Sequence, residues 1–199
     1  MALRILILTV WLLVPVVGYA LHMGPGQDQQ KLDAAADHIR AAEKAVASED
    51  YPAAVEQYEE ALKALPAGRT AEARKIRLEK AKAQMLAKKL PDAHADLKAL
   101  ADELSADPTA DAQLLADTRS ATANANYYMT WLMRLEGLGQ DVWEPEIESA
   151  RQAYKLLAEQ AEKTGDQVAA KKHREDLEAA IRLARMDLGE LQGLPLPSQ

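Results

Sequence analysis

Proline and glycine break residues 30–190 of this chain at short intervals, and the stretches between them are rich in Ala, Leu, Glu, Lys and Arg. Those side chains lose little conformational freedom in a helix, so each stretch favours helix. Beyond residue 21 no stretch sustains the alternation of apolar and polar residues that a half-buried strand needs. The pattern therefore predicts an all-α protein.

The breaks also predict where the helices begin. A proline costs no hydrogen bond in the first turn of a helix, and Thr or Asp before a helix can cap it. We expect starts at Pro52, Thr70, Pro91, Pro108, Pro145 and Asp166, with Thr70 and Asp166 as N-caps. The expected helices span about 30–48, 52–65, 70–88, 91–105, 108–135, 145–164 and 167–188. Such short connections favour antiparallel helix hairpins.

Composition excludes several kinds of function. The net charge is −7 and no basic stripe is interleaved with aromatics, so nucleic-acid binding is not expected. The chain has no cysteine, which excludes disulfides, thiolate metal sites and thiol catalysis. The histidines are too scattered for a metal site, and no nucleotide-binding or nucleophile motif is present. We therefore expect no cofactor, no metal and no catalytic residue.

The first 20 residues, MALRILILTVWLLVPVVGYA, carry one arginine, an apolar run and small residues before Ala20. This is the pattern of a secretory signal peptide, although the same run could stay uncleaved as a membrane anchor over residues 5–21. In either case the body is expected outside the cytoplasm, periplasmic, secreted or tethered. The expected organisation is a signal or anchor at 1–20, a flexible linker at 21–30, a helical domain at 31–190 and an apolar, proline-containing tail at 191–199.

Residues 50–66, DYPAAVEQYEEALKALP, place small Ala54 and Ala61 around Tyr58 and end at a proline. This spacing resembles the second helix of a tetratricopeptide repeat, where small residues allow close helix packing beside an aromatic. In the preceding helix only the small residue, Ala42, agrees in type with the family pattern. The stretch 50–66 is therefore similar to the second half of one repeat unit.

Further units follow along the chain. Residues 51–54 (YPAA) correspond to residues 90–93 (LPDA), 39 positions later. A third unit, with a long insertion between its two halves, is suggested by Ala125, Tyr128, Ala150, Tyr154 and Leu157. The resemblance covers roughly residues 35–164. It implies hairpins stacked as a short α-solenoid, with the helix up to residue 188 as a C-terminal cap.

Tetratricopeptide proteins bind partners in a concave groove lined by the first helix of each hairpin. Carried onto this chain, the resemblance implies groove positions at Ile39, Glu43, Val46, Leu78, Lys82, Met85, Asn126 and Met129. The alternative is that Ile39, Val46, Leu78 and Met85 are ordinary core residues, as helical apolar stripes usually are. Glu43 does not suit the binding of a C-terminal carboxylate, so that mode of recognition is not expected.

The segment 124–148 concentrates aromatic and methionine side chains, which are common at binding surfaces. On a helix Tyr127, Trp131 and Arg134 share one face, so this face and Trp143 form a second candidate partner site. The alternative is that a loop around Trp143 folds back and covers the core.

These observations predict a non-catalytic scaffold of a bacterial cell envelope that binds another envelope protein or peptide. One alternative is a permanent structural subunit of an envelope or secretion assembly, with the aromatic segment as its interface. A homo-oligomer is a further alternative. A third alternative, a small helical hydrolase, would need a deep acidic pocket.

Overall fold

The computed structural model describes residues 25–192 and, apart from them, Trp11. Residues 25–192 form a series of helices without any strand, which confirms the all-α prediction. The helices are α2 (Pro25–Ala47), α3 (Tyr51–Ala64), α4 (Thr70–Leu86), α5 (Leu90–Ala106), α6 (Ala112–Leu135), α7 (Gln140–Thr164), α8 (Gln167–Arg185) and α9 (Leu188–Gln192).

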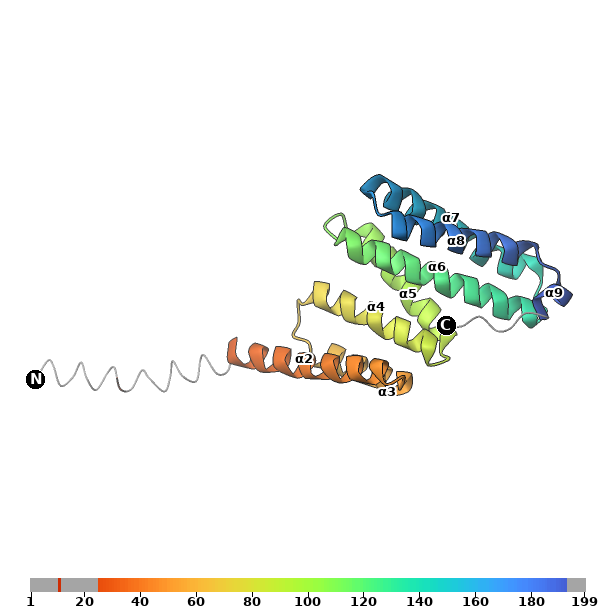
Figure 1. The fold of residues 1–199 in the computed structure, drawn as a ribbon. Coiled ribbons are helices and arrows are strands. Elements are labelled where there is room, and N and C mark those ends of the chain that lie inside the picture. The colour runs from red at the N-terminus through yellow and green to blue at the C-terminus, as the bar shows by residue number, and fades with distance from the viewer. Residues whose placement is uncertain (1–10, 12–24, 193–199) are drawn as a thin grey trace, which may run out of the picture.

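Each helix from α2 to α7 packs against the next one along the chain, so the molecule is a stack of helix hairpins (Figure 1). Beyond these consecutive pairs, α4 touches α6, and the short α9 turns back onto α6. The hairpin α2–α3 lies at one end of the stack and α7–α8 at the other. This arrangement confirms the predicted stack of antiparallel hairpins, and α8 forms its C-terminal end.

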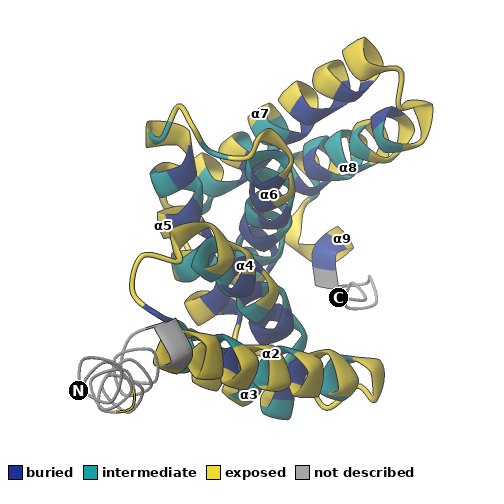
Figure 2. Cartoon of the chain, turned by 90° about the vertical axis from the view of Figure 1, so that its left-hand side faces the viewer, coloured by how far each residue is buried: buried dark blue, intermediate teal, exposed yellow. Residues whose placement is uncertain are grey.

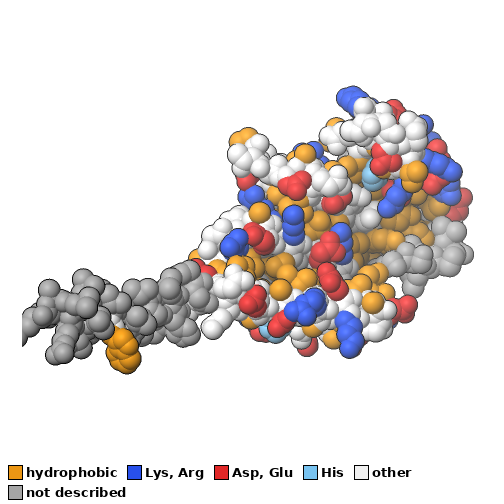
Figure 3. Space-filling view, turned by 60° about the vertical axis from the view of Figure 1, so that its left-hand side comes forward, with side chains coloured by type: hydrophobic (Ala, Val, Ile, Leu, Met, Phe, Trp, Pro, Cys, Tyr) orange, Lys and Arg blue, Asp and Glu red, His pale blue; other side chains and the backbone are white. Residues whose placement is uncertain are grey.

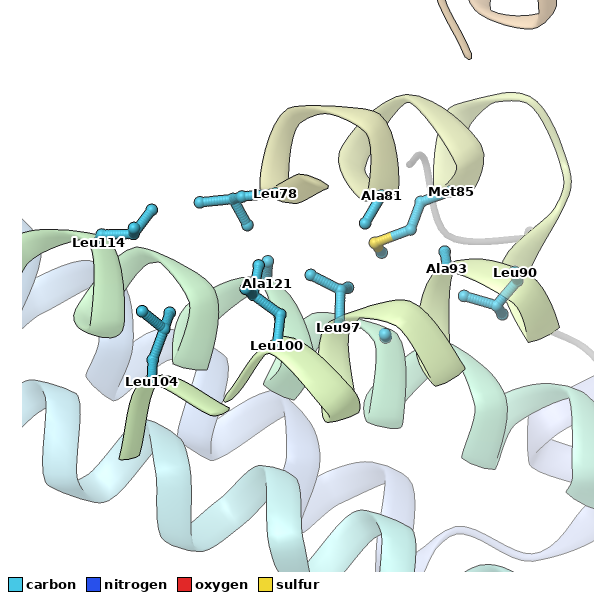
Figure 4. Close-up of a cluster of buried hydrophobic side chains, with 11 residues drawn as sticks. Leu78, Ala81, Met85, Leu90, Ala93, Leu97, Leu100, Leu104, Leu114 and Ala121 are labelled. Carbon is cyan, nitrogen blue, oxygen red and sulfur yellow. The ribbon is translucent and has the colours of Figure 1, made fainter. Parts of the chain in front are cut away.

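Three buried clusters hold the stack together, and neighbouring clusters share one helix. The first cluster joins α2, α3 and α4 around Ala54, Ala61 and Tyr58, which are 0%, 0% and 4% exposed. The middle cluster joins α4, α5 and α6, and Figure 4 shows Leu97 of α5 facing Ala81 and Met85 of α4. The last cluster joins α6, α7, α8 and α9. Because each cluster spans only successive helices, stability is expected to be distributed along the stack.

An ion-pair network on the rim also links α4 to α5. Arg74 Nε lies 2.8 Å from Glu103, and its Nη1 lies 2.7 Å from Asp107. Arg77 reaches the second oxygen of Glu103 at 2.5 Å. Hydrogen bonds from Thr109 and Arg74 lower the pKa of Asp107 to about 2. The network fixes the end of α5 against the start of α4.

Capping follows the prediction at one helix and departs from it at two others. Asp166 accepts a hydrogen bond from the Ala169 amide at 3.0 Å, so it is the N-cap of α8 as predicted. Thr70 is instead the first residue of α4, after Arg69. The start predicted at Pro108 is also wrong, because Asp111 caps α6 by accepting from the amides of the second and third helical residues.

The predicted start at Pro145 is wrong as well. Helix α7 begins five residues earlier, at Gln140, and carries Pro145 inside it. A proline there removes the one N–H that would donate to the Asp141 carbonyl, while the first turn still packs Trp143 against the last cluster. The segment around Val142 and Trp143 is therefore helical rather than the expected loop.

The two ends of the predicted organisation are only partly described. Helix α2 starts at Pro25, so residues 25–30 of the expected linker are helical. At the other end Leu191, the first residue of the expected tail, is 1% exposed and packs in the last cluster. The signal or anchor and residues 193–199 lie outside the described residues. None of the described helices is both long enough and apolar enough to cross a membrane.

Candidate binding groove

Three alternate helices of the stack, α4, α6 and α8, line a common groove. In Figure 2 α5 lies on one side of α6 and α8 on the other. The groove is on the α8 side, because its lining includes Lys172 of α8 and no residue of α5. Figure 3 shows hydrophobic side chains in the hollow of this surface, with acidic and basic side chains around them. A cavity of about 430 Å³ in it is lined by Lys82, Met85, Leu86, Asp117, Ser120, Ala121, Asn124, Tyr128 and Lys172. We call this surface the α4–α6–α8 groove.

A second cavity, of about 660 Å³, continues the groove toward the N-terminal ends of α6 and α8. It shares Asp117, Ser120 and Lys172 with the first cavity and adds His173 of α8. The two cavities together form an elongated depression, a shape that suits an extended chain better than a compact small molecule.

The structure brings only part of the predicted groove together. Lys82 and Met85 line it, although Met85 is 8% exposed and also belongs to the middle cluster. Ile39 packs partly buried against the first cluster, and Glu43 is exposed on α2. Neither of these two α2 residues lines the cavities.

The register predicted for α6 is wrong by two residues. The predicted groove includes Asn126, but this residue is 4% exposed and lies on the opposite side, against α5 and α7. Asn124 lines the groove instead, because two residues along a helix correspond to a rotation of about 200°. The small residue that packs in one cluster with Ala150 of α7 is Ala123, whereas Ala125 packs in the middle cluster.

Asn124 is oriented by a residue of another helix. The Tyr154 hydroxyl of α7 donates to Asn124 Oδ1 at 2.6 Å. Burial raises the pKa of Tyr154, so its hydroxyl stays a donor. The hydrogen bond from Tyr154 fixes the side-chain oxygen of Asn124. The NH₂ group of the same side chain has two N–H donors, and neither of them has an acceptor among the described residues. Asn124 can therefore donate to a carbonyl of a bound chain.

Charged groups also line the groove. Lys172 is exposed at the α8 side, and Lys82 at the α4 side lies 2.8 Å from Glu79. Deeper on α8, His173 Nδ1 lies 3.6 Å from Asp176 Oδ2. Burial raises the pKa of Asp176, because its charged form is poorly solvated there. The groove thus offers ammonium and amide donors, together with the carboxylate of Asp117, beside the apolar side chains of Met85 and Leu86.

The aromatic segment is largely internal. Trp131 is 4% exposed in the last cluster, and Tyr127 and Trp143 pack partly buried against it. Arg134 donates to the backbone carbonyls of Leu183 and Met186, and its guanidinium carbon lies 4.7 Å from the centre of the Trp143 ring. These contacts hold α6 to the end of α8, and Trp131 has no surface to offer a partner.

A polar contact that crosses three helices has no counterpart in the sequence predictions. His94 Nε2 of α5 lies 2.8 Å from Asn126 Oδ1 and 3.1 Å from Glu146 Oε2. Since both neighbours are acceptors, Nε2 carries the proton and donates to them. The three residues are too far apart in sequence to form a motif. Among the described residues, no three His, Cys, Asp or Glu side chains gather closely enough to hold a metal.

A comparison of the sequence with protein-family models found no match, and a search of curated proteins found no similar sequence.

Proposed function

We propose that the protein is a non-catalytic scaffold of the cell envelope, which binds an extended segment of another protein in the α4–α6–α8 groove. The observation that carries the proposal is the groove itself. Residues of α4, α6 and α8 line two cavities that share part of their lining and together form one elongated depression. The resemblance to tetratricopeptide repeats supports this use of the surface, and the apolar N-terminal run supports export of the body.

The lining fits the chemistry of a peptide backbone. An extended chain exposes carbonyl oxygens, and Asn124, Lys82 and Lys172 supply donors for them. Between these polar groups, Met85 and Leu86 of α4 and Ala121 of α6 form apolar contacts for side chains. The orientation of Asn124 by Tyr154 reduces the entropy that binding would otherwise cost.

A library of random peptides displayed on phage would test the proposal with the purified protein. Peptides selected on the protein should lose about twofold to tenfold in affinity for Asn124→Ala, because a neutral hydrogen bond contributes about 0.5–1.5 kcal/mol. They should lose at least about tenfold for Lys172→Ala, because a hydrogen bond that involves a charged group contributes about 1.5–3 kcal/mol. Matched controls on the opposite side are Lys98→Ala and Gln152→Ala, which line a cavity between α5 and α7. If the control substitutions lowered peptide affinity as much as the groove substitutions, or if the groove substitutions left it unchanged, the groove would not be the binding site.

A second candidate is a permanent subunit of a larger envelope assembly, and one observation favours it. Leu132, Leu138 and Val142 are 38%, 41% and 46% exposed around the α6–α7 turn. Exposed apolar groups of this kind often lie in interfaces. A permanent subunit should self-associate or aggregate when purified alone, whereas the proposed scaffold should sediment as a stable monomer in analytical ultracentrifugation.

A further inference from the structure

We infer that the α4–α6–α8 groove is occupied, in the absence of a partner, by the chain's own residues 193–199, GLPLPSQ. The inference rests on the proposed function, because it makes the tail a competitor for the same site. It goes beyond that function because a partner must displace the tail to bind, so partners with low affinity for the groove are excluded.

The structure fixes the point from which this tail departs. After α8 the chain turns back onto α6, where the carbonyls of Leu183 and Met186 accept hydrogen bonds from Arg134. Asp187 and Glu190 then cap α9 reciprocally, with hydrogen bonds of 2.7 and 3.0 Å. These contacts and the buried Leu191 hold α9 against α6, which is one of the three helices that line the groove.

The tail is long enough to reach the groove. Leu191 packs in the same cluster as Trp131, which lies one turn beyond Tyr128 at the edge of the groove. From Trp131 to Asn124 the helix rises about 10 Å at 1.5 Å per residue. Seven residues in an extended, strand-like conformation span about 23 Å at about 3.3 Å per residue, so residues 193–199 can pass both Tyr128 and Asn124.

The composition of the tail matches the lining. Leu194 and Leu196 alternate with two prolines, so in an extended chain both leucines fall on one side. That side can pack on the apolar floor formed by Met85 and Leu86. Two of the seven tail residues are proline and have no N–H, so the tail presents more carbonyl acceptors than N–H donors, and the amide of Asn124 and the lysines are donors for those carbonyls. Proline-rich segments also commonly dock beside aromatic rings, here that of Tyr128.

Disulfide trapping tests this directly, because the native chain contains no cysteine. In the full chain, Leu196→Cys is paired with Lys82→Cys or Ser120→Cys in the groove. Two control pairs use Ser149→Cys on the opposite side and Ile181→Cys in the cavity between α8 and α9. Under mild oxidation a groove pair should crosslink at least about tenfold faster than either control. Equal rates, or faster crosslinking to Ile181→Cys, would overturn the inference.

A second measurement separates this inference from the proposed function. Removal of residues 193–199 should raise the affinity of a phage-selected peptide about threefold to tenfold, as expected for release of a weakly tethered competitor. If selected peptides bind through Asn124 and the truncation leaves their affinity unchanged, the inference fails alone. If the groove substitutions do not weaken the peptides, the proposed function fails, whatever the crosslinks show.

Discussion

Replacement of Trp131 by alanine should lower the free energy of unfolding by about 3–5 kcal/mol, the range for removing a buried Trp or Phe side chain. The indole is 4% exposed and packs among residues of α6, α7, α8 and α9 in the last cluster. Its removal would leave a cavity shared by four helices. For a chain of this size the loss corresponds to a fall in melting temperature of about 6–20 °C.

Trp131→Phe is the matched control for this prediction. The indole Nε1 is buried and has no hydrogen-bond partner among the described residues. An unsatisfied buried donor costs about 1–3 kcal/mol, so phenylalanine loses some packing but also removes this penalty. The phenylalanine variant should therefore stay within about 1.5 kcal/mol of the native protein, well above the alanine variant.

Urea unfolding followed by circular dichroism at the helix band measures both variants without relying on tryptophan fluorescence. If Trp131→Ala stayed within about 1 kcal/mol of the native protein, the indole would not be part of the core. The aromatic segment would then return as a candidate partner surface.

Three further predictions concern caps, charge and the groove. Asp111→Ala should lower the unfolding free energy by about 0.5–2 kcal/mol through loss of the α6 cap, and a change within urea-titration error would argue against that cap. Asp107→Asn should be less stable than the native protein at pH 7, and the difference should vanish as pH falls from about 4 toward 2. The reason is that Thr109 and an α4 arginine hold the folded-state pKa at about 2, so the stabilisation exists above the ordinary pKa and is lost below it. A difference that persists at pH 2 in acid–urea titrations would contradict this assignment. Tyr154→Phe should weaken phage-selected peptides severalfold by releasing Asn124, at a cost to stability of about 1 kcal/mol. Unchanged peptide affinity, measured by fluorescence anisotropy, would show that the hydroxyl does not position the amide.

The features that sequence predicts well in this chain are local and periodic. Ala54, Tyr58 and Ala61 lie on one side of a short amphipathic helix, and their burial follows from their spacing alone. Asp166 is a good cap directly before a helical stretch. Because each of these signals depends on a few neighbouring residues, distant parts of the chain do not change it.

Signals that depend on the rest of the fold are misjudged from sequence. Proline at 145 is compatible with the interior of α7 because the turn before it gains contacts with the last cluster, a gain that no local rule contains. On α6 the alanines at 123 and 125 both allow close packing, and only the positions of α5 and α7 decide which faces which helix. Because Ala123 rather than Ala125 packs with α7, the asparagine that lines the groove is Asn124 and not the predicted Asn126. The approach of His94 to Glu146 depends in the same way on how α5 and α7 meet across α6.

Site-specific photocrosslinking in the cells that make the protein tests the central claim most directly. A photoreactive residue replaces Ser120 in the groove or, as a matched control, Ser149 on the opposite side of the stack. The proposed function predicts one defined adduct with another protein from position 120, lost on adding Asn124→Ala and Lys172→Ala, and none from position 149. Adduct formation from position 149 alone would contradict it and place the binding surface between α5 and α7.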